Sequence, residues 1–148
     1  MVQFSRKIVQ TVFLCVLILT GINGCKDDYV SVVPYVYVDM NINPISYIDN
    51  IPGAFYYFAN KGYGGIILLY DQTENSNPFL AFDAACTYET SSTCRVVPEE
   101  SGFLANCPCC GSKFMLLGGN GSPINGPAIE PLKQYRTSYI GGRVIIRN

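Results

Sequence analysis

Hydrophobic residues recur along this chain in short runs, several of which alternate with polar residues, as half-buried β-strands do. Clusters of glycine, proline and asparagine separate the runs and indicate frequent turns. The pattern predicts strands at residues 35–39, 54–58, 65–70, 79–83, 95–98, 103–106, 114–116, 136–139 and 143–147. No stretch has the spacing of an amphipathic helix, and no segment repeats. We therefore expect an all-β chain with many turns.

The first residues have the features of an export signal. Arg6 and Lys7 precede an apolar run at residues 12–19, which is too short to span a bilayer but fits the centre of a signal peptide. The run leads to Ile22-Asn23-Gly24-Cys25, which resembles a bacterial lipobox. We expect residues 1–24 to be a lipoprotein signal peptide and Cys25 to be lipidated. An ordinary signal peptide with a chance cysteine is the alternative.

Residues 25–34 are expected to form the lipidated anchor and a linker. They are polar, show no periodicity and lead to a proline. Lys26-Asp27-Asp28 resembles a short charged tag that sends some envelope lipoproteins to the cell surface, and a solvated tether is the alternative. The predicted location is the bacterial cell envelope, as an outer-membrane lipoprotein facing the periplasm or the cell surface.

The rest of the chain, residues 35–148, is long enough for one domain with its own core. Without residues 1–24 the chain keeps eight basic and eleven acidic side chains, a net charge of about −3. This balance favours neither a nucleic-acid surface nor a basic membrane patch. Membrane contact is therefore expected through the lipid alone.

Cysteine is the residue type that carries the chemistry of this domain, because the chain contains no histidine. Serine and cysteine hydrolases of the usual kind need a histidine base, so they are excluded. Five cysteines follow the predicted linker, and they are Cys86, Cys94, Cys107, Cys109 and Cys110. In an oxidising compartment an odd number leaves at least one thiol free or bound to another group.

The spacing of these cysteines resembles the Rieske iron–sulfur family. Cys107-Pro108-Cys109-Cys110-Gly111-Ser112 is similar to the second cluster-binding loop of that family, and Gly126-Pro127-Ala128 to its proline loop. Cys86-Thr87-Tyr88 is similar to the start of the first loop. The resemblance implies a Rieske-like antiparallel β-sandwich at residues 35–148, with a small cluster-binding subdomain of two loops, residues 86–94 and 107–112.

The resemblance also implies a role for each residue. Cys86 and Cys107 match the two thiolate ligands, whereas Tyr88 and Cys110 stand where the family has its histidine ligands. Cys94 and Cys109 match the disulfide between the loops, although Cys94 follows Cys86 by eight residues instead of the usual five. The hydroxyl of Ser112 matches the group that tunes the cluster.

Three interpretations of the cysteines remain open. A 2Fe-2S cluster would use Cys86, Cys107 and Cys110, with Tyr88 or water as the fourth ligand, at a lower reduction potential than a two-histidine centre. Zinc would instead take Cys86, Cys94, Cys107 and Cys110 and leave Cys109 spare. Without a metal, disulfides Cys94–Cys109 and either Cys86–Cys107 or Cys86–Cys110 would join the loops.

The expected function follows from these interpretations. With a cluster, the protein would transfer electrons to an unnamed redox partner. Without one, it would be a structural or interaction module. Neither role is catalytic in the usual sense, and the fold alone does not choose between them because function resides in the site.

Overall fold

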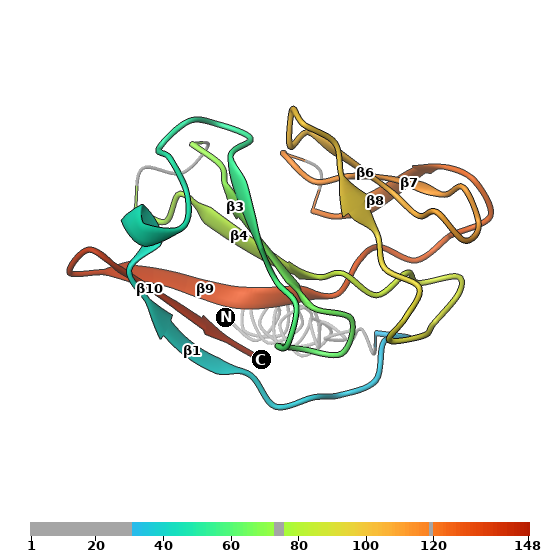
Figure 1. Ribbon diagram of the computed structural model, residues 1–148, viewed down its shortest axis with the longest axis horizontal. Helices are drawn as coiled ribbons and strands as arrows, with labels where there is room; N and C mark the ends of the chain where they lie inside the picture. The colour runs from blue at the N-terminus through green and yellow to red at the C-terminus, as the bar shows by residue number, and fades with distance from the viewer. Residues whose placement is uncertain (1–30, 73–75, 119) are drawn as a thin grey trace, which may run out of the picture. The chain divides into compact units, whose positions relative to one another are not determined.

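Two antiparallel sheets organise the described part of the chain (Figure 1). The larger sheet has the order β1-β10-β9-β4-β3-β2, and the smaller sheet has the order β5-β6-β7-β8. The strands of the larger sheet are β1 (Asp39–Ile42), β2 (Phe55–Phe58), β3 (Ile66–Tyr70), β4 (Phe79–Asp83), β9 (Gln134–Ile140) and β10 (Arg143–Arg147). Those of the smaller sheet are β5 (Val97–Pro98), β6 (Leu104–Asn106), β7 (Lys113–Met115) and β8 (Ser122–Asn125). A short 3-10 helix, η1 (Pro44–Ser46), is the helical element of this part, so the all-β prediction is confirmed.

The computed structural model describes residues 31–72, 76–118 and 120–148. The expected signal peptide, Cys25 and most of the expected linker lie outside these residues. Ser31–Asn148 forms one compact unit. Within the described ranges, no helix has both the length and the apolar character needed to cross a membrane.

Strand β9 makes the larger sheet fold over on itself. Its residues 136–140 pair with β10, whereas Gln134 and Tyr135 pair with β4. The two halves of the sheet then enclose one hydrophobic core, in which Met40 and Val144 from β1 and β10 belong to the same cluster as Leu68 and Ala81 from β3 and β4. This arrangement is the expected antiparallel sandwich.

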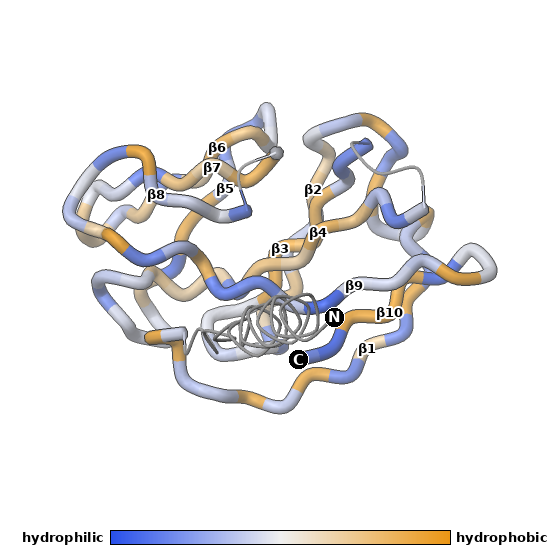
Figure 2. The backbone as a smooth tube through the Cα atoms, turned by 180° about the vertical axis from the view of Figure 1, so that it is seen from behind, coloured by the Kyte–Doolittle hydropathy of each residue, from blue (hydrophilic) through white to orange (hydrophobic). Residues whose placement is uncertain are grey.

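Strand β3 is buried on both faces. Ile66 and Leu68 belong to the core inside the larger sheet, whereas Ile67 and Leu69 belong to a second core shared with the smaller sheet. Successive side chains of a strand point to opposite faces, so a strand between two cores must be apolar throughout. This explains the continuous run of hydrophobic residues, which Figure 2 shows along β3.

The strand expected at residues 35–39 is wrong in position. The strand spans Asp39–Ile42, and its first pair is Asp39 with Arg147. Because β10 ends at Arg147, residues 35–38 lie beyond its last paired residue. The Asn148 side chain holds this segment instead, since its amide donates to the Val36 carbonyl at 2.6 Å and its oxygen accepts from the Val38 N–H at 3.1 Å.

The strand β8 was not expected from the sequence. It contains Pro123 and is mostly exposed, so it lacks the alternation of a half-buried strand. It lies at the edge of the smaller sheet, so one of its sides has no neighbouring strand. Proline has no backbone N–H, and on this unpaired side the missing group removes no hydrogen bond between strands. The chain shifts register beside it, between Lys113 and Phe114 of β7.

Candidate metal centre

Two loops with cysteines meet beside the smaller sheet. The first, residues 86–94, follows β4 and is closed by a hydrogen bond from the Cys86 N–H to the Cys94 carbonyl at 3.1 Å. The second, residues 107–112, joins β6 to β7. Its backbone turns through hydrogen bonds from the Gly111 N–H to the Cys107 carbonyl at 2.9 Å and from the Cys107 N–H to the Ser112 carbonyl at 2.8 Å. The antiparallel pairing of the flanking strands therefore fixes where the cysteines lie.

A third segment, residues 126–130, packs against both loops. The hydroxyl oxygen of Ser112 accepts from the Ala128 N–H at 3.0 Å, and the Thr87 hydroxyl donates to the Glu130 carbonyl at 2.7 Å. Gly126 has a φ of +91°, and a Cβ atom there would lie 2.5 Å from the Ser112 Cα. Only glycine allows this close approach. The expected proline segment therefore does contact the second loop.

Three free thiols gather between the loops. Cys86 and Cys107 are buried and Cys110 is partly exposed, and their Sγ atoms all lie within 4.8 Å of one another. The Sγ atoms of Cys86 and Cys110 are 3.6 Å apart. Two thiolates bound to one tetrahedral metal are separated by about 3.8 Å at usual metal–sulfur distances. The structure thus brings together three of the four expected ligands at a spacing suited to a metal.

A disulfide joins Cys94 of the first loop to Cys109 of the second. Their Cα atoms are 6.2 Å apart, which is an ordinary separation for a disulfide. In this state Cys94 is not a thiolate, so the four-thiolate zinc site would require the disulfide to be reduced first. The Cys107 Sγ lies 3.5 Å from the Cys94 Sγ, so the disulfide borders the three thiols directly.

Tyr88, the expected fourth ligand, is 56% exposed. Within the described residues its hydroxyl makes no hydrogen bond to any of the three thiols, and its role as a ligand stays a prediction. Ser112, the expected tuning residue, is buried and accepts a hydrogen bond from the Cys110 thiol at 3.1 Å. Of the predicted site residues, Ser112 thus touches a candidate ligand, whereas Tyr88 lies at the solvent boundary.

The environments of Cys86 and Cys110 move their pKa values in opposite directions. Burial raises the pKa of the Cys86 thiol to about 12, although the backbone N–H groups of Glu89 and Tyr88 oppose the shift. At Cys110 partial burial also acts to raise the pKa, but it is outweighed by the hydrogen bonds that the Ser112 hydroxyl and N–H donate to the sulfur once it is ionised, with help from the neighbouring thiols. The net pKa of Cys110 is lowered, so this thiol ionises more readily than Cys86.

A buried carboxylate that the sequence analysis missed supports the first loop. Asp83, at the end of β4, accepts hydrogen bonds from the N–H groups of Tyr63 (2.7 Å), Gly64 (2.8 Å) and Ala85 (2.9 Å). The hydroxyl of Tyr135 donates to it at 2.7 Å. The only signal in the sequence was an acidic residue at the end of an apolar strand. Asp83 fixes the backbone from which Cys86 follows.

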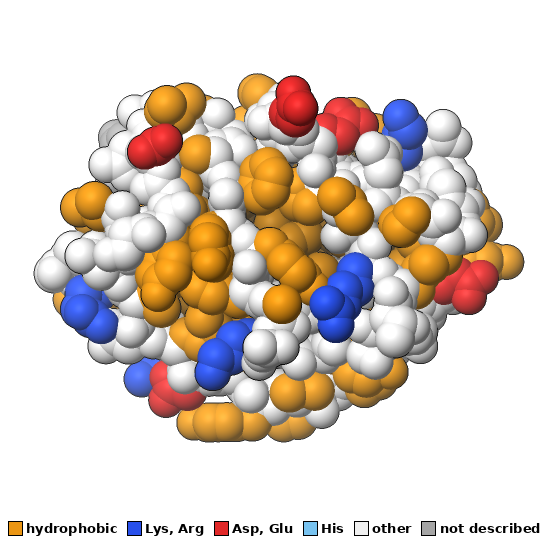
Figure 3. Space-filling model, in the orientation of Figure 1, with side chains coloured by type: hydrophobic (Ala, Val, Ile, Leu, Met, Phe, Trp, Pro, Cys, Tyr) orange, Lys and Arg blue, Asp and Glu red, His pale blue; other side chains and the backbone are white. Residues whose placement is uncertain are grey.

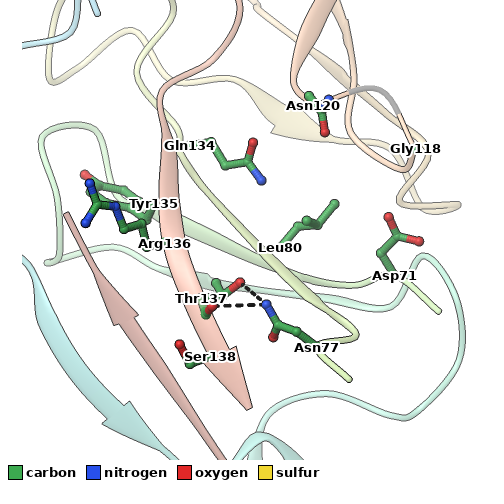
Figure 4. A pocket seen from close by; sticks show the side chains of 10 residues that line it. All are labelled: Asp71, Asn77, Leu80, Gly118, Asn120, Gln134, Tyr135, Arg136, Thr137 and Ser138. Carbon is green, nitrogen blue, oxygen red and sulfur yellow. Dashed lines mark hydrogen bonds between the residues drawn. The ribbon is translucent and has the colours of Figure 1, made fainter. Parts of the chain in front are cut away.

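A separate polar cavity of about 790 Å³ lies away from the cysteines, beside β4 and β9 (Figure 4). The Asn77 amide donates across it to the carbonyl and hydroxyl oxygens of Thr137, at 3.0 and 2.9 Å. Its lining consists of Asp71, Asn77, Leu80, Gly118, Asn120, Gln134, Tyr135, Arg136, Thr137 and Ser138. No predicted site residue lines this cavity.

The chain is similar to known iron–sulfur proteins in sequence and in fold. No family model matches the chain. The cytochrome b6-f complex iron-sulfur subunit of Chlorobaculum tepidum is 27% identical over 108 residues, which cover 73% of this chain and 52% of that subunit. The matched part of this chain therefore spans about half the length of that relative.

Two solved structures share the fold. The cyanobacterial plasma membrane Rieske protein PetC3 from Synechocystis PCC 6803 matches with a TM-score of 0.51 and 24% identity, over 64% of this chain and 86% of that one. The ferredoxin of carbazole 1,9a-dioxygenase from Nocardioides aromaticivorans IC177 matches with a TM-score of 0.51 and 15% identity, over 76% of this chain and 98% of that one. The paired cysteine loops, the two sheets and these similarities together show that the chain has a Rieske-like fold.

Proposed function

We propose that this protein is a lipid-anchored electron carrier of the bacterial envelope, whose Rieske-type domain binds a 2Fe-2S or other iron centre. Cys86, Cys107 and Cys110 are the proposed protein ligands. The observation that carries the proposal is the gathering of three free thiols within 4.8 Å of one another, in the loops that the Rieske-type fold uses for its cluster. Electron exchange is the chemistry that such a centre supplies when bound.

The donor set fits a cluster in part. A 2Fe-2S cluster has four terminal ligands, and three of these positions have a thiol. Water or Tyr88 is the proposed fourth ligand. Thiolate in place of neutral imidazole stabilises the oxidised iron, so the reduction potential should be lower than in a two-histidine centre. The buried Cys86 and Cys107 exclude water from the inner side, and Ser112 orients the Cys110 sulfur.

An electron carrier also needs a surface on which its redox partner docks. Beside the candidate ligands, Tyr88 is 56% exposed and Ile129 is 85% exposed. Figure 3 shows that hydrophobic side chains also gather in the middle of one face, with charged side chains spaced around them. We place partner docking at Tyr88 and Ile129, because electron transfer requires the partner to approach the centre closely.

A metal-free structural or interaction module is the second candidate function. The observation that favours it is that protein contacts alone hold the loops together, through the Cys94–Cys109 disulfide and the hydrogen bonds of Ser112 and Thr87. A chain without histidine can therefore keep the frame without any iron. In this case the exposed tyrosines would serve a partner protein.

Metal analysis distinguishes the two functions. The full chain is purified in detergent, without oxygen and without a histidine tag, and its iron, zinc, acid-labile sulfide and visible spectrum are measured. We expect about two irons and two sulfides per chain with a brown colour. One zinc would replace this proposal with a structural zinc site, and no metal would leave the metal-free module.

Three variants assign the ligands. Cys107→Ser and Cys110→Ser should each lose most of the iron and the colour. Ser112→Ala is the matched control because it removes a hydroxyl beside the thiols without removing a ligand, and it should keep the iron with a shifted reduction potential. Iron that persists in both cysteine variants would contradict the proposed ligand set.

A further inference from the structure

The three free thiols differ in access to solvent. Cys86 and Cys107 are buried, whereas Cys110 is partly exposed. The neighbouring Gly111 is exposed, and a Cβ atom built on it would meet no atom within 4 Å. The outer side of the second loop is therefore open beside Cys110, and a small molecule from solvent reaches this sulfur first.

A buried sulfur lies close to that of Cys110. The Cys86 Sγ lies 3.6 Å from the Cys110 Sγ. The Cys107 Sγ lies within 4.8 Å of both of these sulfur atoms, and it is 3.5 Å from the Cys94 Sγ, which is already bonded to Cys109. A disulfide bond of about 2.05 Å between Cys86 and Cys110 requires their sulfur atoms to approach by only about 1.5 Å.

We propose that Cys86 and Cys110 form a reversible dithiol–disulfide couple in the metal-free protein, with Cys110 as the entry thiol and Cys86 as the resolving thiol. The oxidant is a low-molecular-weight disulfide. This activity exchanges two electrons through sulfur and goes beyond the proposed iron chemistry. It stands whether or not iron binds, because it concerns the metal-free thiols.

The chemistry balances in two exchange steps. The Cys110 sulfur attacks one sulfur of the oxidant, the S–S bond of the oxidant breaks, and one thiol leaves with a proton. The Cys86 sulfur then attacks the Cys110 sulfur, the mixed disulfide breaks, and the second thiol leaves. Two protein thiols have lost two electrons and two protons, and the oxidant has gained them as two thiols. Cys107 remains reduced.

The test uses the full chain in detergent, purified without reductant or oxygen and treated with a chelator. The protein is incubated with oxidised glutathione, alkylated and mapped by mass spectrometry. We expect a Cys86–Cys110 cross-linked peptide, with Cys107 alkylated and the Cys94–Cys109 disulfide retained. Cys107 of the unchanged chain, which should stay available for alkylation, is the internal control, whereas Cys110→Ser should leave Cys86 reduced.

A second measurement uses the unchanged chain and does not depend on the folding of a variant. Iodoacetamide should modify Cys110 at least about tenfold faster than Cys86 or Cys107, because access controls the rate. A Cys86–Cys107 bond, a stable glutathione adduct at Cys110, three unreacted thiols or equal alkylation rates would each overturn the proposal. Failure of iron binding alone would leave it intact.

Discussion

Asp83 and Tyr135 form a buried polar pair between β4 and β9. Asp83 is fully buried and Tyr135 is 2% exposed. A buried carboxylate is costly unless hydrogen bonds replace water, and Asp83 accepts four of them. Burial raises the pKa of the Tyr135 hydroxyl above its usual value of 10.0, and the hydrogen bond to Asp83 and its negative charge add to the shift.

Because of this pair, the free energy of unfolding should decrease at alkaline pH. Because the pKa of Tyr135 is raised in the folded protein, its contribution is complete well below the usual value of 10.0 and is lost as the pH rises above that value. We expect the free energy of unfolding, measured with urea, to fall between about pH 8 and pH 11. Tyr135→Phe should be less stable by about 1.5–3 kcal/mol at pH 8, since it removes a hydrogen bond to a charged group.

Between about pH 8 and pH 11, the free energy of unfolding of Tyr135→Phe should fall less than that of the unchanged protein. Part of the loss will remain, because the pKa of Cys86 is also raised. Tyr56→Phe, at a partly exposed position on β2, is the control and should leave both the stability and its pH dependence nearly unchanged. An equal pH dependence in Tyr135→Phe and the unchanged protein would rule out this role for Tyr135.

The sequence predicts the cysteines of the site but not the residues that support them. Cys86, Cys107 and Cys110 are recognised because their spacing resembles a known pair of loops. Asp83 resembles any acidic residue at the start of a turn. Its contact with Tyr135 spans 52 positions and exists only because β4 pairs with β9, which hydrophobic periodicity does not reveal.

At the scale of elements, the predictions succeed for the buried strands β3 and β4 and fail for two edge strands, β8 and β1. Strand β4 is found at the predicted residues and β3 one residue shorter, because burial forces their apolar composition. Strand β8 was missed because an edge strand with one open face needs little hydrophobic surface. Strand β1 is displaced because the end of β10 decides where pairing begins.

The disulfide between the two loops should contribute substantially to stability. Cys94 and Cys109 are separated by 15 positions, and closing a loop of this length stabilises a protein by about 3 kcal/mol in the chain-entropy description. We expect the double variant Cys94→Ser/Cys109→Ser to lose about 2–4 kcal/mol of unfolding free energy, measured in urea without reductant.

Reductant provides the control for the disulfide. It should lower the stability of the unchanged protein by a similar amount and leave the double variant unaffected. A loss below about 1 kcal/mol in the variant would mean that the hydrogen bonds of Ser112 and Thr87 hold the loops without the disulfide.

At the scale of the whole molecule, β3 borders two cores, one inside the larger sheet and one that joins the larger sheet to the smaller sheet. The loops with the candidate ligands follow directly from these sheets. A net charge of about −3 after the expected cleavage gives the protein no general attraction to an anionic membrane surface. The proposed attachment to the envelope would therefore depend on the expected lipid at Cys25.

Intact-mass measurement tests this anchor. Protein extracted from membranes should lack residues 1–24 and carry a diacylglycerol group on Cys25. Cys25→Ser should keep its full length and carry no lipid, whereas Cys15→Ser, within the expected signal peptide, should be processed normally. A mature chain that begins elsewhere without lipid would exclude the lipoprotein assignment.

The bonds that close the site belong to the protein and not to a metal. The Cys94–Cys109 disulfide, the contact of Ser112 with Ala128 and the hydrogen bond of Thr87 would all persist in an empty site. Over evolutionary time, such a frame allows ligand positions such as 88 and 110 to change one at a time. A lineage can then pass from one cofactor to another, or to none, through ancestral proteins that all still fold.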